Sequence, residues 1–368
     1  MNILIIDPFY EYSHRVWAEG LQKYSTHHVD ILSLSPHHWK WRMTGGAVEL
    51  AEKYKALDSV FNLILASDML DLSAFLALAK VDRSRVATAI YFHENQITYP
   101  WNTKDSSAQK EKNHHYGFIN FTSCLTADKV YFNSKFHEQE FLNSLPSFLK
   151  IFPSFGHQKY VDTISAKSEV LPLGMDLRLN KPLKEQSNLP CFLWNHRWEH
   201  DKNPELFFQT LYKLKADITP FELIVMGKSY ERQPAIFEEA REHLQDEILH
   251  FGYVESAEEY IDLVDRANIL LVTSNQDFFG ISIVEAIASG LYPLLPNRLA
   301  YPDHIPDELH QKHLYQNDDD VLPMLKELIL ARGFVEASSL PTFVRKYDWG
   351  NLIELYDSTF SNLENRSF

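Results

Sequence analysis

The sequence has few of the features that mark a disulfide-rich or a membrane-spanning protein. Only two of its 368 residues are cysteines, Cys124 and Cys191, and both lie in apolar surroundings. Buried free thiols in a reducing compartment fit this usage better than a disulfide framework, so we predict a cytoplasmic protein. No stretch approaches the roughly 18 to 20 apolar residues of a membrane span. We therefore expect no membrane partner.

Basic residues are also scarce relative to acidic ones. The chain has 35 Lys and Arg residues against 50 Asp and Glu residues, which gives a formal net charge of −15. Such a net charge disfavours non-specific binding to nucleic acid or to anionic membranes. A polyanionic ligand would therefore need a local basic patch.

The distribution of apolar residues predicts an α/β fold. Short apolar runs alternate with amphipathic stretches, the pattern of strands and helices in mostly parallel sheets. The pattern restarts near residue 190, after a segment, 171–190, that is rich in Pro, Gly, Asn and charge. We interpret this segment as a linker between two Rossmann-like, doubly wound domains, 1–172 and 187–348, that face each other across a cleft. The amphipathic segment 349–368 is a candidate to pack back on the first domain.

Individual elements follow from the same periodicity. The predicted strands are 3–6, 29–34, 62–65, 87–92 and 130–132 in the first half, and 192–194, 223–226, 248–250 and 269–272 in the second. The predicted helices are 15–24, 71–79, 205–215, 235–244, 257–264 and 281–288.

Two stretches in the second domain predict a diphosphate site. In "SNQDFFGISIVEAIASG" (274–290), a strand feeds a turn at Gly280 and then a helix, whose first amides, those of Ile281 and Ser282, suit phosphate oxygens. In "LWNHRWEHDKNPE" (193–205), another strand ends at Arg197 and Lys202, which suit the same diphosphate. We expect both strand ends at one edge of a sheet.

Two acids complete this predicted site. Glu285 is placed to accept hydrogen bonds from ribose hydroxyls, and Asp277 to accept from a sugar or to orient the loop. Each feature alone has an ordinary structural explanation, because a turn such as "FFG" commonly just connects a strand to a helix, and lone cations are usually solvated. Their joint occurrence at matching strand ends favours a binding site.

These residues carry a resemblance to a known family. The pair Asp277 and Glu285 around "FFGIS", with "HRWEHDKNP", resembles the retaining GT-B glycosyltransferases of family 4, where the first acid is usually Glu rather than Asp. The segments "FYEYSHRVWAEGL", "HHWKWRM", "SDMLDLSAFLAL" and "HENQITYP" are similar to the tRNA-queuosine mannosyltransferase family, except that Glu11 and Tyr12 replace a pair of small residues. This resemblance covers nearly the whole chain.

The resemblance implies a GT-B fold and a specific reaction. Members move mannose from GDP-mannose onto the cyclopentenediol of queuosine in tRNA-Asp, with retention of configuration, and the departing phosphate takes the acceptor's proton on the same face. We expect no cofactor beyond this donor, and a nucleotide sugar and queuosine-modified tRNA-Asp as partners. Two other interpretations stay open: a polysaccharide or small-glycoside acceptor with another nucleotide sugar, and a non-catalytic module that binds a nucleotide or tRNA.

The first domain supplies further candidates at its strand ends. His93, Glu94 and Asn95 follow the apolar run "VATAIYF". We assign His93 to the reacting sugar or the acceptor hydroxyl, and Glu94 and Asn95 to donor or acceptor hydroxyls; a structural histidine in a turn is the alternative. Ser13 and His14 begin a helix, where Ser13 is either an N-cap or, with His14, a contact to the diphosphate or acceptor.

A run of alternating aromatic and basic residues predicts contact with RNA. Trp39, Lys40, Trp41 and Arg42 interleave rings that can stack on unpaired bases with cations that can hold phosphates. Further positive charge lies between Lys104 and His115. Tryptophans in the core and solvated lysines would explain both stretches equally well, and the acidity of the chain argues against RNA.

The sequence does not predict a metal site. The "HH" pairs at 27, 37 and 114 lack the spacing of a zinc ligand set. The Asp-x-Asp pattern of metal-dependent transferases occurs only within "DDD" at 318–320, in a polar connection that we interpret as a helix start.

Overall fold

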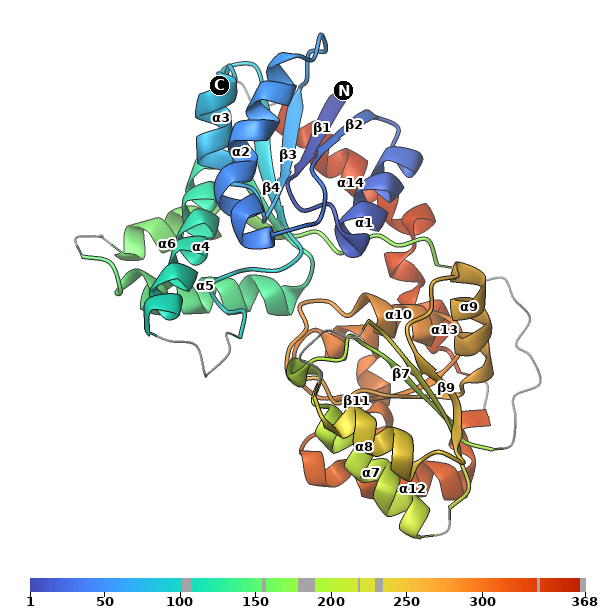
Figure 1. The fold of residues 1–368 in the computed structure, drawn as a ribbon. Coiled ribbons are helices and arrows are strands. Elements are labelled where there is room, and N and C mark those ends of the chain that lie inside the picture. Colours follow the sequence, from blue (N-terminus) through green and yellow to red (C-terminus); the bar gives the residue numbers. More distant parts are fainter. Residues whose placement is uncertain are drawn as a thin grey trace. The chain divides into compact units, whose positions relative to one another are not determined.

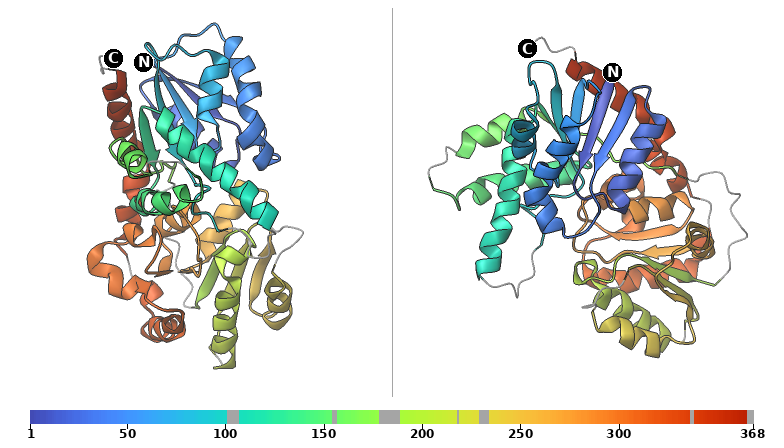
Figure 2. Two further views of the ribbon diagram at one scale, coloured as in Figure 1. Left: turned by 90° about the vertical axis from the view of Figure 1, so that its left-hand side faces the viewer. Right: turned by 45° about the horizontal axis from the view of Figure 1, so that its top comes forward.

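In the computed structural model, the chain forms two units, and each is built around a six-stranded parallel sheet (Figure 1). The structure describes residues 1–100, 107–153, 157–177, 189–217, 219–228, 234–335 and 338–364. The N-terminal unit comprises Met1–Asp176 and Tyr347–Phe368, and the C-terminal unit comprises Leu177–Lys346. Helices cover both faces of each sheet, as in other doubly wound domains (Figure 2).

The sheet of the N-terminal unit has the strand order β2-β1-β3-β4-β5-β6. Its strands are β1 (Asn2–Asp7), β2 (His28–Ser33), β3 (Leu63–Ser67), β4 (Ala87–Phe92), β5 (Lys129–Phe132) and β6 (Ser168–Val170). Its helices are α1 (Tyr12–Tyr24), α2 (Trp39–Lys55), α3 (Leu72–Ala79), α4 (Ser107–Thr126), α5 (Lys135–Leu149), α6 (His157–Ser165) and α14 (Trp349–Glu364).

Alternate residues of these strands face two different helical layers. Leu4 and Ile6 of β1 belong to a core shared with α2 to α6, whereas the intervening Ile5 is buried outside that core. On the second face, the Trp17 ring of α1 stacks on Tyr91 of β4 at 4.4 Å. Because both faces are covered, the strands read as continuous apolar runs, and this is why they are recognisable in the sequence.

The C-terminal helix α14 belongs to the N-terminal unit. Met175 forms a parallel bridge with Asp348, and the Trp349 side chain is buried. A Cβ added at Gly20 would lie 2.0 Å from the Trp349 indole, so α1 needs a glycine there. The chain therefore leaves this unit after Asp176 and returns at Tyr347, a few residues from the expected boundaries at 172 and 348. Most of the expected linker, 178–188, lies outside the described residues.

The sheet of the C-terminal unit has the strand order β12-β11-β10-β7-β8-β9. Its strands are β7 (Cys191–Asn195), β8 (Glu222–Met226), β9 (Ile248–Gly252), β10 (Ile269–Leu271), β11 (Tyr292–Pro296) and β12 (Leu314–Tyr315). Its helices are α7 (Pro204–Ala216), α8 (Ile236–His243), α9 (Ala257–Arg266), α10 (Ile281–Ala288), α11 (His310–His313), α12 (Val321–Ala331) and α13 (Leu340–Phe343). One core joins β7 to α7, α8 and α12, and α9, α10 and α13 lie on the other side of the sheet (Figure 1).

Several predicted helix starts are confirmed by their capping geometry. Asn203, in the left-handed conformation, caps α7 just before Pro204, and Gly280 caps α10. The acidic run Asp318–Asp320 is a short 3₁₀ turn that leads into α12, as expected of a helix start. Among the described residues, no helix combines the length and the apolar character that crossing a membrane demands.

Candidate active site

In the C-terminal unit, the two stretches singled out in the sequence meet at one edge of the sheet. β7 and β10 are parallel neighbours, so their carboxyl ends lie side by side. Asn195, the last residue of β7, donates from Nδ2 to the Ser282 carbonyl in the first turn of α10, at 2.9 Å. The predicted convergence of the two strand ends is therefore observed.

Gly280 gives α10 its start at this edge. Its φ of +91° lies in the left-handed region that favours glycine, and an added Cβ would lie 3.3 Å from the Tyr301 ring. Ile281 and Ser282 follow in the first turn, where backbone amides have no acceptor within the helix. The positive end of the helix dipole and these amides form an arrangement that suits an anion.

Lys202 lies against the loop that precedes Gly280. Its side chain is 9% exposed, and Nζ donates to the Gln276 carbonyl at 2.6 Å and lies 3.4 Å from Asp277 Oδ2. Burial raises the pKa of Asp277, but Lys202 and His196 outweigh this effect and hold the pKa below its usual value. Asp277 is therefore an ionised acid whose nearest cation is Lys202.

Arg197 and Glu285 are more open to solvent than Lys202. The Arg197 side chain is 45% exposed, and its guanidinium pairs with Glu199 at 3.1 Å. Glu285 is half-buried and accepts a hydrogen bond from the Tyr260 hydroxyl at 3.3 Å. Both residues therefore have protein partners, and both retain surface that a ligand can reach.

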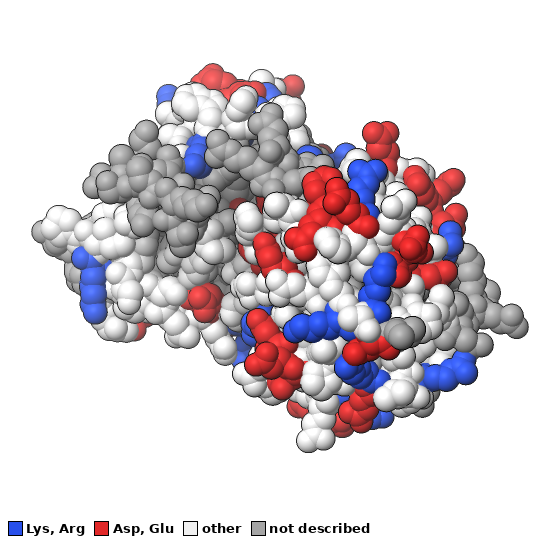
Figure 3. Space-filling model, turned by 60° about the horizontal axis from the view of Figure 1, so that its bottom comes forward, with Lys and Arg blue, Asp and Glu red and all other residues white. Residues whose placement is uncertain are grey.

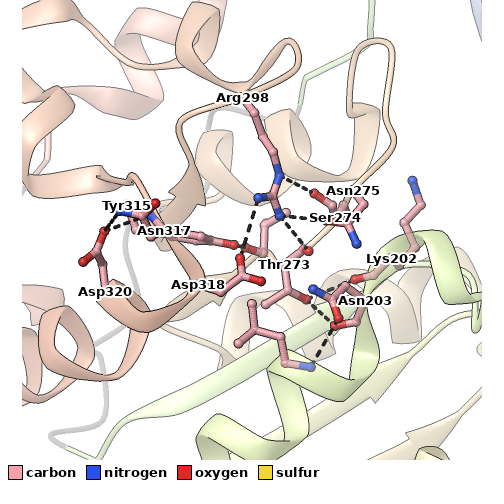
Figure 4. Close-up of polar contacts among 12 residues, drawn as sticks. Lys202, Asn203, Thr273, Ser274, Asn275, Arg298, Tyr315, Asn317, Asp318 and Asp320 are labelled. Atoms are coloured by element: carbon pink, nitrogen blue, oxygen red, sulfur yellow. Dashed lines mark hydrogen bonds and ion pairs between the residues drawn. The ribbon is translucent and has the colours of Figure 1, made fainter. Parts of the chain in front are cut away.

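A network of bonds to backbone carbonyls fixes the loop between β10 and α10 (Figure 4). Thr273 Oγ1 donates to the carbonyls of Lys202 and Asn203, at 3.0 and 2.9 Å. Arg298, which follows β11, donates to the carbonyls of Thr273 and Ser274 from the other side. Because three strand ends hold this loop, Asp277 and Gly280 have fixed positions.

In the N-terminal unit, three neighbouring strands bring polar residues to the same edge. β1 ends at Asp7, β3 is followed by Asp68, and β4 is followed by His93; these strands pair in the order β1-β3-β4. His14 of α1 completes the group, because its Nδ1 lies 2.7 Å from Asp7 Oδ2. The rings of His14 and His93 stack with centroids 4.0 Å apart and planes 23° apart.

The backbone of His93 is anchored on both sides of the residue. Its amide donates to Asp68 Oδ1 at 2.8 Å, and its carbonyl accepts from Asn133 Nδ2 at 2.9 Å. The side chain is 8% exposed, and among the described residues neither ring nitrogen has a hydrogen-bond partner. The His93 ring is therefore held in place while its two polar atoms are left for another group.

The protonation states at this edge differ between the two histidines. Burial lowers the pKa of His14, but Asp7 outweighs burial and raises it to about 9. Burial and the neighbouring His14 hold the pKa of His93 well below its usual value. Burial raises the pKa of Asp68, with Glu94 acting in the same direction and His14 opposing them. At neutral pH, His14 is therefore a cation and His93 is neutral.

Comparison with known proteins places this arrangement in a family. Residues 2–175 match the family model described as tRNA-queuosine alpha-mannosyltransferase N-terminal, and residues 178–329 match glycosyl transferases group 1. The chain is 34% identical over 318 residues to the tRNA-queuosine alpha-mannosyltransferase of Drosophila melanogaster, covering 83% of this chain and 82% of the fly protein. The chain belongs to the tRNA-queuosine alpha-mannosyltransferase family. The resemblance inferred from the sequence is confirmed, and so is the prediction of a glycosyltransferase enzyme.

Solved structures confirm the predicted GT-B class of this family member. The sucrose-phosphate synthase of Thermosynechococcus elongatus superposes with a TM-score of 0.69 at 14% identity, covering 99% of both chains. Anabaena HepE, solved in complex with UDP, superposes with a TM-score of 0.65 at 13% identity, covering 98% of this chain and all of HepE. At these identities the likeness concerns the fold, with its two parallel sheets and flanking helices.

The structure shows the surroundings of three further residues predicted for the N-terminal part of the site. Asn95 is fully buried; its Oδ1 accepts from the amides of Ile97 and Thr98, so its geometry argues against the expected acceptor contact. Glu94 is half-buried and accepts from Gln96 Nε2 at 2.9 Å. Ser13 is not the N-cap of α1, because that helix begins at Tyr12 with Glu11 as its cap.

The aromatic and basic run begins helix α2 and divides into two environments. Trp39 is partly buried against a small cluster around Met43, with its ring 5.2 Å from that of Tyr116. Its surroundings therefore fit the alternative of a packed tryptophan rather than a contact with RNA. Trp41 is 65% exposed. Lys40 Nζ lies 5.4 Å from the Trp39 ring. Arg42 donates to the Ser35 carbonyl and pairs with Glu49.

The second predicted basic stretch runs from Lys104 to His115. Lys104 lies outside the described residues, whereas Lys110, Lys112, His114 and His115 belong to α4. The His114 ring lies 6.3 Å from that of Phe148, and the His115 ring lies 5.9 Å from that of Tyr116.

Sequence reasoning missed four residues that the structure places at these edges. Asp7 is the last residue of the otherwise largely apolar β1, and Asp68 directly follows β3; an acid at the end of an apolar run was the available signal. His196 follows β7 within the predicted diphosphate-binding stretch 193–205; it is buried, and burial together with Lys202 lowers its pKa to about 3. Arg298 follows β11, a strand that the apolar periodicity did not reveal because Pro293 and Pro296 interrupt it.

Proposed function

We propose that this enzyme transfers mannose from GDP-mannose to the cyclopentenediol of queuosine in tRNA-Asp, with retention of configuration and without a metal ion. The observation that carries the proposal is the match to a tRNA-queuosine alpha-mannosyltransferase across more than four-fifths of both chains. The matched range on the N-terminal side, 2–175, includes the Asp7, His14, Asp68 and His93 cluster. The matched range on the C-terminal side, 178–329, includes Lys202, Asp277 and Gly280.

The diphosphate of the donor would lie at the start of α10. Its oxygens would accept from the amides of Ile281 and Ser282, where the helix dipole favours negative charge. Lys202 would share its ammonium between the diphosphate and Asp277, which it approaches to 3.4 Å. Arg197 would add an exposed guanidinium, and Glu285 would accept from ribose hydroxyls. This assignment keeps the roles that the sequence analysis gave to these residues.

In the reaction, the bond between C1 of mannose and the diphosphate oxygen breaks, and a bond forms between C1 and an acceptor hydroxyl on the same face. The hydroxyl proton passes to the departing diphosphate, so the protein needs no nucleophile. Its task is to orient the sugar and to stabilise the charge that accumulates on the diphosphate. Asp277 would orient the sugar, and His93 and Glu94 would bind hydroxyl groups of mannose or the acceptor.

The tRNA would contact the start of α2, where the Trp41 ring is exposed and the Arg42 side chain, paired with Glu49, is 16% exposed. Trp41 presents a ring on which an unpaired anticodon-loop base could stack, and Lys40 and Arg42 flank it with positive charge. By contrast, basic and acidic side chains are interspersed on the face of the C-terminal unit that comes forward in Figure 3. A mixed surface of that kind attracts a polyanion less strongly than a patch of one sign.

A transfer assay tests this proposal. The enzyme is incubated with GDP-mannose and tRNA-Asp that carries queuosine, in buffer with EDTA, and the nucleosides are examined by mass spectrometry. We expect one added hexose on queuosine and none on tRNA-Asp with unmodified guanosine. Hexose transfer from another nucleotide sugar only would refute the donor, and transfer only after metal is restored would refute metal independence. Donor binding without transfer to any acceptor would favour a non-catalytic module.

A further inference from the structure

The pair of stacked histidines at the edge of the N-terminal sheet contains a group, His14, to which the proposed function gives no task. His14 lies behind His93, with its centroid 4.0 Å from that of His93, and its Nδ1 is bonded to Asp7. Both members of this ion pair are nearly inaccessible, at 6% for His14 and 1% for Asp7. A ligand reaches neither side chain easily. A buried charge pair that does not contact a ligand either stabilises the fold or acts on its neighbour.

The neighbour on which the pair can act is His93. The His93 ring is enclosed by His14 on one face, by the Trp17 ring edge-on at 5.0 Å, and by the Tyr91 ring at 4.9 Å. These contacts use its carbon surface and leave Nδ1 and Nε2 buried without a partner among the described residues. An unpaired nitrogen in a buried place is costly unless a ligand completes its bonding.

Charge decides what these nitrogens can do. A neutral imidazole has one N–H donor and one acceptor nitrogen, whereas the imidazolium has two donors. A sugar hydroxyl can both donate and accept, so a neutral ring can bind either side of it. A permanent cation stacked on His93 disfavours a second positive charge there, because like charges in a buried place repel.

We propose that Asp7 and His14 are positioning residues whose buried ion pair holds the His93 ring neutral and in place, so that its two nitrogens bind hydroxyl groups as one donor and one acceptor. The identity of those hydroxyls, on mannose or on the cyclopentenediol, rests on the proposed function. The state of the two histidines does not depend on it.

All titratable groups that face this pair are consistent with this role. Asp7 of β1, Asp68 after β3 and Glu94 after β4 are the acids around His14; Asp7 contributes most to its charged state, and burial raises the pKa of Asp68, which weakens the contribution of that acid. His137 of α5 is the further histidine near His93, and burial holds its pKa well below the usual value, so it adds no charge at neutral pH. Tyr91 stays neutral because burial raises its pKa. The only cation against His93 is therefore His14 within the described residues.

Nuclear magnetic resonance of the full-length enzyme with isotope-labelled histidine tests the charge states directly. In the wild-type protein, we expect one imidazole to stay charged at pH 8, and another, His93, to stay neutral down to pH 5. In D7N, the charged signal should titrate at pH 6.5 or below. The exposed partner of Lys23 supplies a matched control, because D176N should leave both signals unchanged.

Kinetics test whether the charge states matter for binding hydroxyls. In D7N the cation beside His93 is lost at neutral pH, while burial still lowers the pKa of His93, so the fall of kcat/KM on the acid side should begin at a higher pH than in the wild type. A free imidazole with a pKa of about 6.5 sets the upper limit, which is a roughly fourfold fall between pH 8 and pH 6. The wild type and D176N should stay level over this range, and D7E, which restores the charge, should recover the level profile. H14Q, which removes the cation, should behave as D7N does.

The possible results separate this inference from the proposed function. A wild-type spectrum without any histidine charged at pH 8 overturns the inference, even if D7N and H14Q fail to fold. The inference is also overturned if kcat/KM of folded D7N and H14Q depends on pH in the acid range as it does in the wild type. If the spectrum shows the expected charged and neutral histidines but the enzyme transfers no mannose to queuosine, the proposed function is refuted and the inference about the ion pair is retained.

Discussion

The two sheet edges use buried ion pairs in different ways. At the edge of the C-terminal sheet, the cation Lys202 is itself the group proposed to meet the ligand, and Asp277 is its partner at 3.4 Å. At the edge of the N-terminal sheet, the cation His14 is bonded to Asp7 at 2.7 Å and lies behind a neutral ring, His93. The first arrangement suits an anionic ligand and the second suits neutral hydroxyls.

The two arrangements differ because a diphosphate and a hydroxyl group need different partners. A diphosphate gains from a cation in direct contact, because hydrogen bonds between an ionised donor and an ionised acceptor are stronger than neutral ones. A hydroxyl gains little from a full charge but needs a donor and an acceptor in fixed positions. Under the proposed function, the cation at the C-terminal edge contacts the ligand itself, whereas the cation at the N-terminal edge contacts the ring that binds the ligand.

Removing the Lys202 charge should have the largest effect. In K202M, the side chain keeps its length but loses its ammonium, so the departing diphosphate loses a charged contact, and we expect kcat/KM for mannosyl transfer to fall about 10²- to 10³-fold. The control is K215M, because Lys215 pairs with Glu247 in the same unit and has no role in the proposed site.

A second variant distinguishes charge from stability at this edge. K202M leaves the Asp277 carboxylate buried without its cation, which lowers stability. K202M/D277N removes both charges, so thermal stability should return towards that of the wild type while activity stays low. Recovery of activity in the double variant would contradict the role of Lys202.

The ion pair behind His93 predicts a pH dependence of stability. The pKa of His14 is about 9 in the folded state and about 6.5 in the unfolded state. The stabilisation is therefore fully present below pH 6.5 and is lost as pH rises through 9, and it amounts to about 3 kcal/mol. In urea unfolding followed by fluorescence, the gap between wild type and D7N should shrink by that amount between pH 6.5 and 9.5. A constant gap would show that Asp7 contributes packing alone.

The two tryptophans of α2 should separate RNA binding from folding. W41A removes an exposed ring and should weaken binding of tRNA by about 1 to 3 kcal/mol, with little change in melting temperature. W39A removes a ring packed near Met43 and Tyr116, so it should lower the free energy of unfolding by on the order of 2 kcal/mol. Filter binding of tRNA and thermal denaturation measure the two effects. If W41A and the wild type bind tRNA with equal affinity, the RNA-binding surface does not include Trp41.

Much of the fold was predictable because the strands are buried on both faces. β4 and α10 have the predicted bounds, and the other predicted strands differ at their ends by a few residues. The missed strands have physical reasons: β6 and β12 are only three and two residues long, and β11 contains two prolines. Short or proline-bearing strands give little periodic signal.

The site was predictable where a residue type indicates chemistry by itself. Gly280 and Lys202 belong to this group, because left-handed backbone and positive charge suit a phosphate. The side chain of Asn95 bonds within its own loop, which no spacing in the sequence indicates. The stacking of His14 on His93 joins residues 79 positions apart, through the pairing of strands and the docking of α1. Such contacts depend on tertiary packing and therefore require the structure.

Calorimetric titration of GDP-mannose into the full-length wild type, K202M and H93Q tests the division between the two edges most directly. The account predicts that K202M loses most of its donor affinity, because the diphosphate loses its charged contact. H93Q should bind the donor within a few-fold of wild type yet transfer mannose at least about 10²-fold more slowly. Equal donor affinity in K202M and wild type would contradict the assignment of the diphosphate to the Lys202 and Gly280 edge.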